Sequence, residues 1–209
     1  MTFPKFKLTY WDAKIRAEPI RLAFAINGIP FEDERVSREH FAAELKQSAP
    51  FGQVPILTVD DKLVLAQSTA ILRYVGKIGP VKLYPEDPIK AIIADQLISH
   101  VQDIESALGA AFVFTDLQQR DAYRANLTAN VLPTRLKQLD EFIAQHVSQS
   151  DEITIGDLYV YQLNTGFLTT TGFAFTGQPK NSVAGFEHIQ KVVEKVKSHP
   201  AVAEWEARH

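Results

Sequence analysis

Two hydrophobic periods alternate along the first part of the chain. At residues 5–10 every second side chain is apolar, which predicts a half-buried strand. Residues 18–26 carry apolar side chains at helical spacing, with Pro19 in the first turn and Gly28 beyond the end, which predicts a helix. A second strand and a polar, weakly helical stretch are predicted at residues 31–36 and 39–46.

A hairpin and a further helix are predicted next. Residues 55–60 and 62–65 read as two strands around the turn Asp60-Asp61. Ser68 offers a helix N-cap before the next apolar periodic run. The predicted order of elements is therefore β-α-β-α-β-β-α.

The pattern downstream of the prolines near residue 80 is helical. Thr154 and Asp157 have the spacing of a capping box. We predict an α/β domain at 1–80, a linker at 81–87 and an all-α domain at 88–209. The helical runs lie at about residues 89–114, 119–146, 156–167 and 189–197.

Composition narrows the function classes. The net charge of −3 and the scattered lysines and arginines argue against nucleic acid or an anionic membrane surface as partner. No run approaches the roughly 20 apolar residues of a membrane span, and charges interrupt the first residues, so we expect a cytoplasmic protein without a signal peptide. The histidines show no metal-ligand spacing, so no metal is predicted. Because there is no cysteine, any sulfur chemistry must come from a ligand.

Pro55 opens a predicted strand although proline cannot donate a ladder hydrogen bond. A cis bond after Val54 would turn the N–H and C=O of Val54 outward, where they could pair with a peptide-like ligand. The alternative is an ordinary trans proline at a strand start. The order of elements favours the first reading, because a proline at the start of the third strand is typical of the thioredoxin-like fold.

Several fragments resemble one family in order and spacing: Tyr10, "RAEPIRL" from Arg16, "FGQVPIL" from Phe51, "LAQSTAILRYV" from Leu65 and "TIGD" from Thr154. Over essentially the whole chain, the sequence resembles the cytosolic glutathione S-transferases of the tyrosine type, sigma class above all. The resemblance implies a thioredoxin-like glutathione-binding domain, followed by an all-α domain that contributes the second-substrate pocket. It also implies a homodimer.

The resemblance assigns catalysis to Tyr10 and Arg16. Tyr10 is implied to donate its hydroxyl to the sulfur of glutathione, and Arg16 to support the site electrostatically. On local sequence alone, Tyr10 reads as an aromatic strand residue with its hydroxyl at the surface; only the resemblance favours the catalytic role. The family's Arg-Gly-Arg reads Lys14-Ile15-Arg16 here, so the glycine is missing.

Glutathione is a tripeptide with two carboxylates and one amine, so its site needs donors for anions. By resemblance, Gln67 and Ser68 hold the γ-glutamyl carboxylate at the start of a helix, where the dipole favours negative charge. Gln53, Val54 and Pro55 are implied to lie along the peptide, Val54 pairing through its main chain.

At the glycine end, the resemblance points to Lys46 and to the region of Phe41. A phenylalanine has no indole N–H, so that contact is either absent or made by His40. Lys46 could also be a solvated surface charge.

Within the helical half, "HVQDIES" resembles a helix in which an aspartate reaches across the dimer to the glutathione amine. Asp103 holds that position; an exposed helix carboxylate is the alternative. Ser106 and Ala110 share its helical face and, with Trp11, are predicted to line the second-substrate pocket.

The function implied is a glutathione transferase that conjugates the thiolate to small hydrophobic electrophiles, with glutathione as co-substrate and a role in detoxification. One alternative is a glutathione-dependent isomerase or peroxidase of the prostaglandin-synthase type. Another is a non-catalytic glutathione-binding, ligand-binding or structural protein.

Overall fold

The chain divides into two compact units. The computed structural model describes residues 2–147, 149–168 and 183–209. One unit comprises Met1–Asp87 with Ser198–His209, and the other comprises Pro88–Lys197. The predicted boundaries at 80 and 88 stay a prediction, but the last residues of the chain group with the first unit.

The first unit is built on a four-stranded mixed sheet of order β2-β1-β3-β4. Strand β1 pairs in parallel with β2 and antiparallel with β3, and β3 pairs antiparallel with β4. Together with the helical second unit, this confirms the predicted fold class. The strands are β1 (Phe6–Trp11), β2 (Glu32–Val36), β3 (Ile56–Val59) and β4 (Leu63–Ala66).

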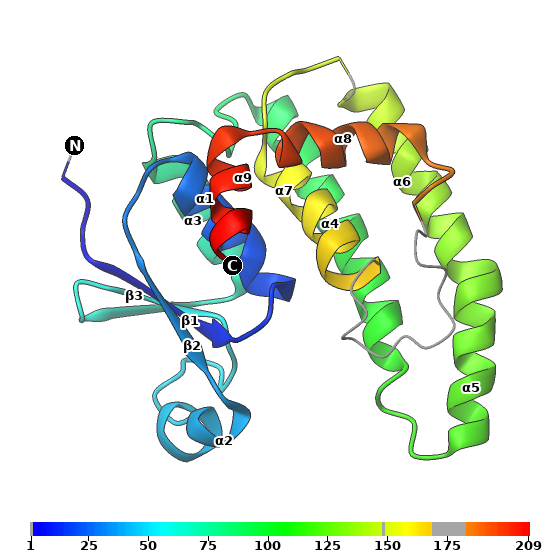
Figure 1. Ribbon diagram of the computed structural model, residues 1–209, viewed down its shortest axis with the longest axis horizontal. Coiled ribbons are helices and arrows are strands. Elements are labelled where there is room, and N and C mark those ends of the chain that lie inside the picture. The colour runs from blue at the N-terminus through cyan, green and yellow to red at the C-terminus, as the bar shows by residue number, and fades with distance from the viewer. Residues whose placement is uncertain (1, 148, 169–182) are drawn as a thin grey trace. The chain divides into compact units, whose positions relative to one another are not determined.

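Helices cover the sheet from two sides. In Figure 1, α1, α3 and α9 lie above the strands and α2 lies below them. Fully buried apolar residues such as Phe6, Leu8 and Leu57 on the strands and Phe24 and Leu72 on the helices form the core. The helical elements are a 3₁₀ turn (Ile15–Ala17), α1 (Glu18–Ile26), α2 (Arg38–His40), a π-helical segment (Phe41–Leu45), α3 (Ser68–Ile78) and α9 (Pro200–Arg208).

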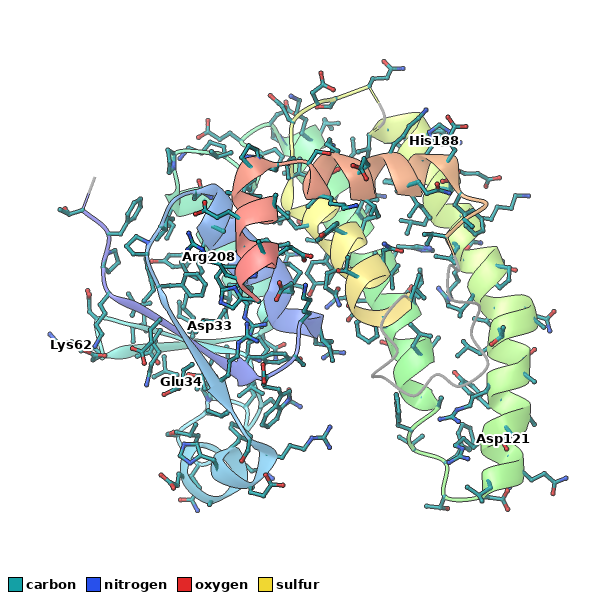
Figure 2. The ribbon with its side chains drawn as sticks, viewed as in Figure 1. Asp33, Glu34, Lys62, Asp121, His188 and Arg208 are labelled. Atoms are coloured by element: carbon teal, nitrogen blue, oxygen red, sulfur yellow. The ribbon has the colours of Figure 1, made fainter. Side chains whose placement is uncertain are left out.

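The predicted hairpin between β3 and β4 is confirmed. Asp60 and Asp61 both have positive φ, 51° and 55°, as a turn that matches the strand twist requires, and Val59 pairs with Leu63 across the loop. The N–H of Lys62, labelled in Figure 2, donates to the carbonyl of Val59 over 3.1 Å. The turn fixes the register of the two strands.

The second unit consists of helices. Its core contains buried leucines and isoleucines from α4, α6 and α7, for example Leu97, Ile104, Leu136 and Leu158. No helix in the part of the chain that the structure describes is long and apolar enough to cross a membrane. The helical elements are α4 (Pro88–Ala110), α5 (Leu117–Asn126), a π-helical segment (Leu127–Val131), α6 (Leu132–His146), α7 (Ile155–Gln162), a second π-helical segment (Leu163–Leu168) and α8 (Glu187–Lys197).

Two details of the helices differ from the sequence-based expectation. The run predicted as one helix at 119–146 is instead α5, a π-helical segment and α6. Helix α9 lies in the region predicted to be helical but was not predicted as a separate run. The capping box of Thr154 and Asp157 at the start of α7 is confirmed.

Substituting Gly79 by alanine is expected to destabilise the first unit by about 2 kcal/mol. A Cβ at Gly79 would overlap the amide of Asn27. That amide donates to the carbonyl of Ala23 (3.1 Å) and accepts from the N–H of Val81 (2.8 Å), so it cannot move without losing hydrogen bonds. Thermal unfolding of Gly79→Ala measures the loss.

Gly109→Ala is the matched control, because nothing lies within 4 Å of a Cβ at this position in α4. Alanine has the higher helix propensity, so this variant is expected to be as stable as the parent chain or slightly more stable. Equal melting temperatures for the two variants would contradict the proposed overlap.

Candidate active site

The sheet register brings three of the predicted site residues into one row. Thr9 pairs with Ile56, and Ile56 pairs with Ala66. Continuing both registers by one residue places Tyr10 opposite Pro55, and Pro55 opposite Gln67. Neighbouring strands lie about 4.8 Å apart, so the row spans about 10 Å across β1, β3 and β4.

A small open pocket lies at this end of the sheet. It collects the predicted arginine and most of the residues predicted to bind glutathione. The Val54–Pro55 peptide bond in its wall is cis. Tyr10 is not among the lining residues, which are Arg16, Phe51, Gln53, Val54, Pro55, Ala66, Gln67 and Ser68.

The amino terminus of α3 forms one wall of the pocket. Gln67 is the N-cap residue and its side chain makes no capping hydrogen bond; Ser68, predicted as the N-cap, is instead the first helical residue and is buried. Gln67 has φ 72° and ψ 106°, a conformation that is costly for a residue with a side chain. Gln67 therefore begins α3 at the pocket wall, and the positive end of the α3 dipole lies at the pocket.

Tyr10 lies at the end of β1 with only 4% of its surface exposed. Its ring centroid is 6.3 Å from that of Trp11, and the guanidinium carbon of Arg21 lies 5.8 Å from it. The Tyr10 ring is therefore fixed by its neighbours. Arg16, exposed in the 3₁₀ turn that follows β1, lines the pocket.

The turn between Tyr10 and Arg16 contains a strained residue. Ile15 has φ 24°, in the region that disfavours a β-branched side chain. Glycine, the residue that the resemblance implies at this position, adopts such a φ without steric cost. Because isoleucine stands where the resemblance implies glycine, the backbone next to Arg16 is strained.

The predicted glycine-end residues have unequal surroundings. Phe41 is 6% exposed and belongs to an apolar cluster with Val36 and Ile56, and its ring meets that of Trp11 edge-on at 5.2 Å. His40 instead pairs its Nδ1 with Glu44 over 3.3 Å. Phe41 thus has a packing role, and its predicted contact with the ligand stays a prediction.

Lys46 is exposed and its stem lies beside the loop that ends at Gly52, since a Cβ built on Gly52 would be 3.8 Å from Lys46 Cε. The ammonium group is thereby kept near the loop whose next residues, Gln53 and Val54, line the pocket. Its predicted role as a glutathione contact remains a prediction.

Other predicted residues lie in the second unit, on α4. The Asp103 side chain is 67% exposed and its Oδ2 is 3.5 Å from Arg135. Asp103 also lines a hollow of about 370 Å³ between α4 and α6, beside His100. Ser106 is exposed and its hydroxyl donates to the carbonyl of Gln102. Ala110 ends α4. The pocket predicted from Trp11, Ser106 and Ala110 stays a prediction.

Sequence reasoning missed a buried charged group in α1. Arg21 is fully buried, and its guanidinium contacts Glu18 at 3.1 Å and Asp33 at 2.8 Å. Trp205, from the other end of the chain, donates its Nε1–H to Glu18 over 2.9 Å. A charged pair at i, i+3 within the apolar run of "RAEPIRL" was the one available signal.

Two charged residues of β2 have shifted pKa values. Partial burial alone would raise the pKa of Glu34, but hydrogen bonds from Thr9 and Lys7 outweigh burial and hold that pKa below its ordinary value. Burial would lower the pKa of Arg35, but its bonds to Asp12 and to Asp33, labelled with Glu34 in Figure 2, raise it. Both β2 side chains therefore stay charged at neutral pH.

Within residues 2–147, 149–168 and 183–209, no three histidine, aspartate or glutamate side chains are grouped so that they could hold a metal ion. The polar groups around the pocket are an arginine, two glutamines, a serine and a helix amino terminus. Such groups suit an anionic, peptide-like ligand.

Comparisons with known proteins agree with this reading. The family model described as "Glutathione S-transferase, N-terminal domain" matches residues 6–77, and the model of the C-terminal domain matches residues 102–209. The chain is 31% identical to glutathione S-transferase 1 of Ascaris suum, covering 97% of this chain and 95% of that protein. It is 30% identical to the hematopoietic prostaglandin D synthase of Gallus gallus, with the same coverage. Among solved structures, prostaglandin synthase D of Nilaparvata lugens superposes with a TM-score of 0.84 at 27% identity, over 99% of this chain and 98% of that one.

Proposed function

Because the chain belongs to the glutathione S-transferase family, we propose that it binds glutathione in the pocket at the end of its sheet and conjugates the thiolate to small hydrophobic electrophiles. The chain is an enzyme of this family. The proposal assigns residues of this chain to glutathione binding and to thiolate formation, and it names the class of the second substrate.

The row of Tyr10, Pro55 and Gln67 carries this proposal. An extended tripeptide spans about 10 Å, which equals the distance across the three strands of the row. The strand order puts Gln67 at one end of the row, Pro55 in its middle and Tyr10 at the other end, so a tripeptide with one end at the start of α3 reaches Tyr10 within its own length.

The pocket residues can bind the polar ends of the tripeptide. Gln67 and Ser68 at the start of α3 hold the γ-glutamyl carboxylate, since the helix dipole and its N–H groups favour an anion there. Val54 pairs through its main chain with the ligand backbone, Gln53 lies alongside, and Lys46 attracts the glycine carboxylate.

The reaction needs the thiol as its anion. A thiol with a pKa of about 8.5 is only a few per cent ionised at pH 7, and the thiolate is the nucleophile. Tyr10 donates its hydroxyl to the sulfur and the positive charge of Arg16 stabilises the anion. The sulfur then bonds to the electrophilic carbon, the leaving group departs with its electron pair, and the thiol proton passes to solvent. Trp11, Ser106 and Ala110 are our candidates for contact with the electrophile.

Further assignments rest on the motifs of the sequence. We place the chain in the tyrosine type, nearest to sigma, and in the cytoplasm, and we assign it a role in detoxification. We also propose a homodimer in which Asp103 of one chain meets the amine of the glutathione bound by the other. The exposure of the Asp103 carboxylate supports access by a second chain.

A second candidate activity has a specific observation behind it. The relatives from Gallus gallus and Nilaparvata lugens are named as prostaglandin D synthases. A glutathione-dependent isomerase or a peroxidase would use the same thiolate, so the site itself favours none of these reactions over transfer.

The proposal is tested by assaying the purified protein for conjugation of glutathione to a generic aromatic chloride, alongside retention on glutathione resin. We expect both. Retention without conjugation would favour the isomerase or a non-catalytic binder, and an isomerase assay with a prostaglandin endoperoxide then separates these two. Absence of retention would contradict the assignment of the pocket.

A further inference from the structure

A buried charge lies directly beneath the turn that links Tyr10 to Arg16. Arg21 on α1 has no exposed surface. Its Nη1 donates to the carbonyl of Ala13 over 2.8 Å, and its Nη2 approaches the carbonyl of Trp11 at 3.5 Å. The first carbonyl belongs to the turn and the second to the last residue of β1, so the guanidinium holds the backbone that follows Tyr10.

The geometry of Arg21 is itself set by two carboxylates. Its Nε donates to Asp33 Oδ1 over 2.8 Å, and its Nη1 lies 3.1 Å from Glu18 Oε2. A buried ion pair is seldom more stable than apolar packing of the same volume. What the ion pair contributes here is a fixed orientation of the Arg21 guanidinium. Because that group is planar, its N–H groups then donate to the backbone carbonyls in fixed directions.

The last helix of the chain is attached to the same group. Trp205 on α9 donates its Nε1–H to Glu18 Oε1 over 2.9 Å, which leaves Oε2 for Arg21. Glu206, the next residue, pairs with Lys14 of the turn at 2.9 Å. Figure 1 shows α9 running beside α1 within the first unit.

Aromatic packing holds α9 in this place. The Trp205 ring stacks on Phe31 with centroids 5.7 Å apart, and Phe31 stacks on Phe24 of α1 at 4.6 Å. The stack fixes the position of the Trp205 ring, and the single polar atom of that ring points at Glu18. A phenylalanine ring at position 205 could make the same stack on Phe31. The hydrogen bond from Trp205 to Glu18 is therefore not needed for the packing and has a role of its own.

We propose that α9 is a clamp that holds the turn at residues 12–17 in place. Trp205 is a positioning residue, which acts through Glu18 and Arg21 to fix the orientation of the Tyr10 and Arg16 side chains. This inference rests on the proposed function for its catalytic consequence. Without the hydrogen bond from Trp205, the Glu18 carboxylate is free to turn away from Arg21. The Arg21 guanidinium is then no longer held in one orientation, and its hydrogen bonds to the backbone carbonyls weaken. The Tyr10 hydroxyl then stabilises the bound thiolate less well.

The test uses Trp205→Phe, which keeps a ring for the stack on Phe31 and removes the N–H donor. A rise of about one unit in the pKa of a bound thiol that titrates about one to two units below 8.5 lowers the thiolate fraction at neutral pH about three- to eightfold. We therefore expect kcat for conjugation to fall about three- to eightfold at neutral pH, to recover at alkaline pH, and KM for glutathione to change little. Glu206→Gln, which removes only the pair with Lys14, should shift the profile in the same direction by less.

Asp140→Ala is the matched control. Asp140 accepts the N–H of Ile189 over 2.9 Å in the second unit, so its loss lowers stability without touching the turn. It should leave the pH profile unchanged. A profile of Trp205→Phe equal to that of the parent chain, or an equal shift in Asp140→Ala, would overturn the clamp.

Hydrogen exchange makes the outcome independent of activity. In Trp205→Phe the amides of residues 12–17 should exchange faster, including Ala13, whose N–H donates to the carbonyl of Trp11 over 2.7 Å. Unchanged exchange there contradicts the clamp whatever the activity. Faster exchange in Trp205→Phe would support the clamp even if the parent chain, which has Tyr10, conjugates no glutathione. That combination would contradict the proposed function instead.

Discussion

Tyr10→Phe is expected to lower the rate of glutathione conjugation at neutral pH by about eight- to twenty-fivefold. A hydrogen bond to a charged partner contributes about 1.5 to 3 kcal/mol, which corresponds to about one to two units in the pKa of the bound thiol. Without the phenol the thiol stays largely protonated, so fewer bound molecules can react. The variant should recover activity as the pH approaches the ordinary thiol pKa.

Binding of glutathione should be nearly unchanged in Tyr10→Phe, since the ring is retained and is held between Trp11 and Arg21. Steady-state kcat and KM across neutral and alkaline pH, together with the melting temperature, measure the effect. Tyr74→Phe is the matched control, because its ring packs on Phe6 at 6.3 Å in the same unit, on a different element. An unchanged rate in Tyr10→Phe, or an equal loss in Tyr74→Phe, would contradict the role assigned to Tyr10.

Asp157→Ala is expected to lower the free energy of unfolding by about 3 kcal/mol. The carboxylate is fully buried. Its Oδ2 accepts from the N–H of Thr154 over 2.8 Å and from the Thr154 hydroxyl over 2.7 Å, and its Oδ1 pairs with Lys195 of α8 at 2.8 Å. One substitution thus removes the Asp157 half of the capping box of α7 and the ionic link of α7 to α8.

Thermal unfolding of Asp157→Ala should show a melting temperature lower by about 6 to 12 °C. Asp116→Ala separates the two contributions, because Asp116 caps α5 by accepting from the N–H of Gln119 over 2.9 Å at an exposed position. Its loss should cost only about 1 kcal/mol. Equal losses in the two variants would show that burial and Lys195 add nothing to the cap.

The fold was predictable where the signals were local. The period of two in β1, Pro19 in the first turn of α1 and the capping box of α7 each arise within a few residues of chain. Strand order then follows from the family resemblance. Of the site, the residues that line the pocket could be named, because they lie in short motifs at the ends of these local elements.

Other features could not be predicted because they depend on contacts between distant residues. The hydrogen bond of Trp205 to Glu18 joins positions 187 residues apart. No local pattern records such a contact. The same holds for the complete burial of Arg21, which depends on Asp33 from another element, and for Phe41, whose place in an apolar cluster is set by β3.

The most direct test is the ionisation of the bound thiol, followed by the ultraviolet absorbance of the thiolate while the complex of the parent chain with glutathione is titrated with base. We expect an apparent pKa about one to two units below the value of about 8.5 for a free thiol, with most of that difference lost in Tyr10→Phe. A bound thiol that titrates at its ordinary value in the parent chain would contradict thiolate stabilisation by Tyr10 as the basis of function.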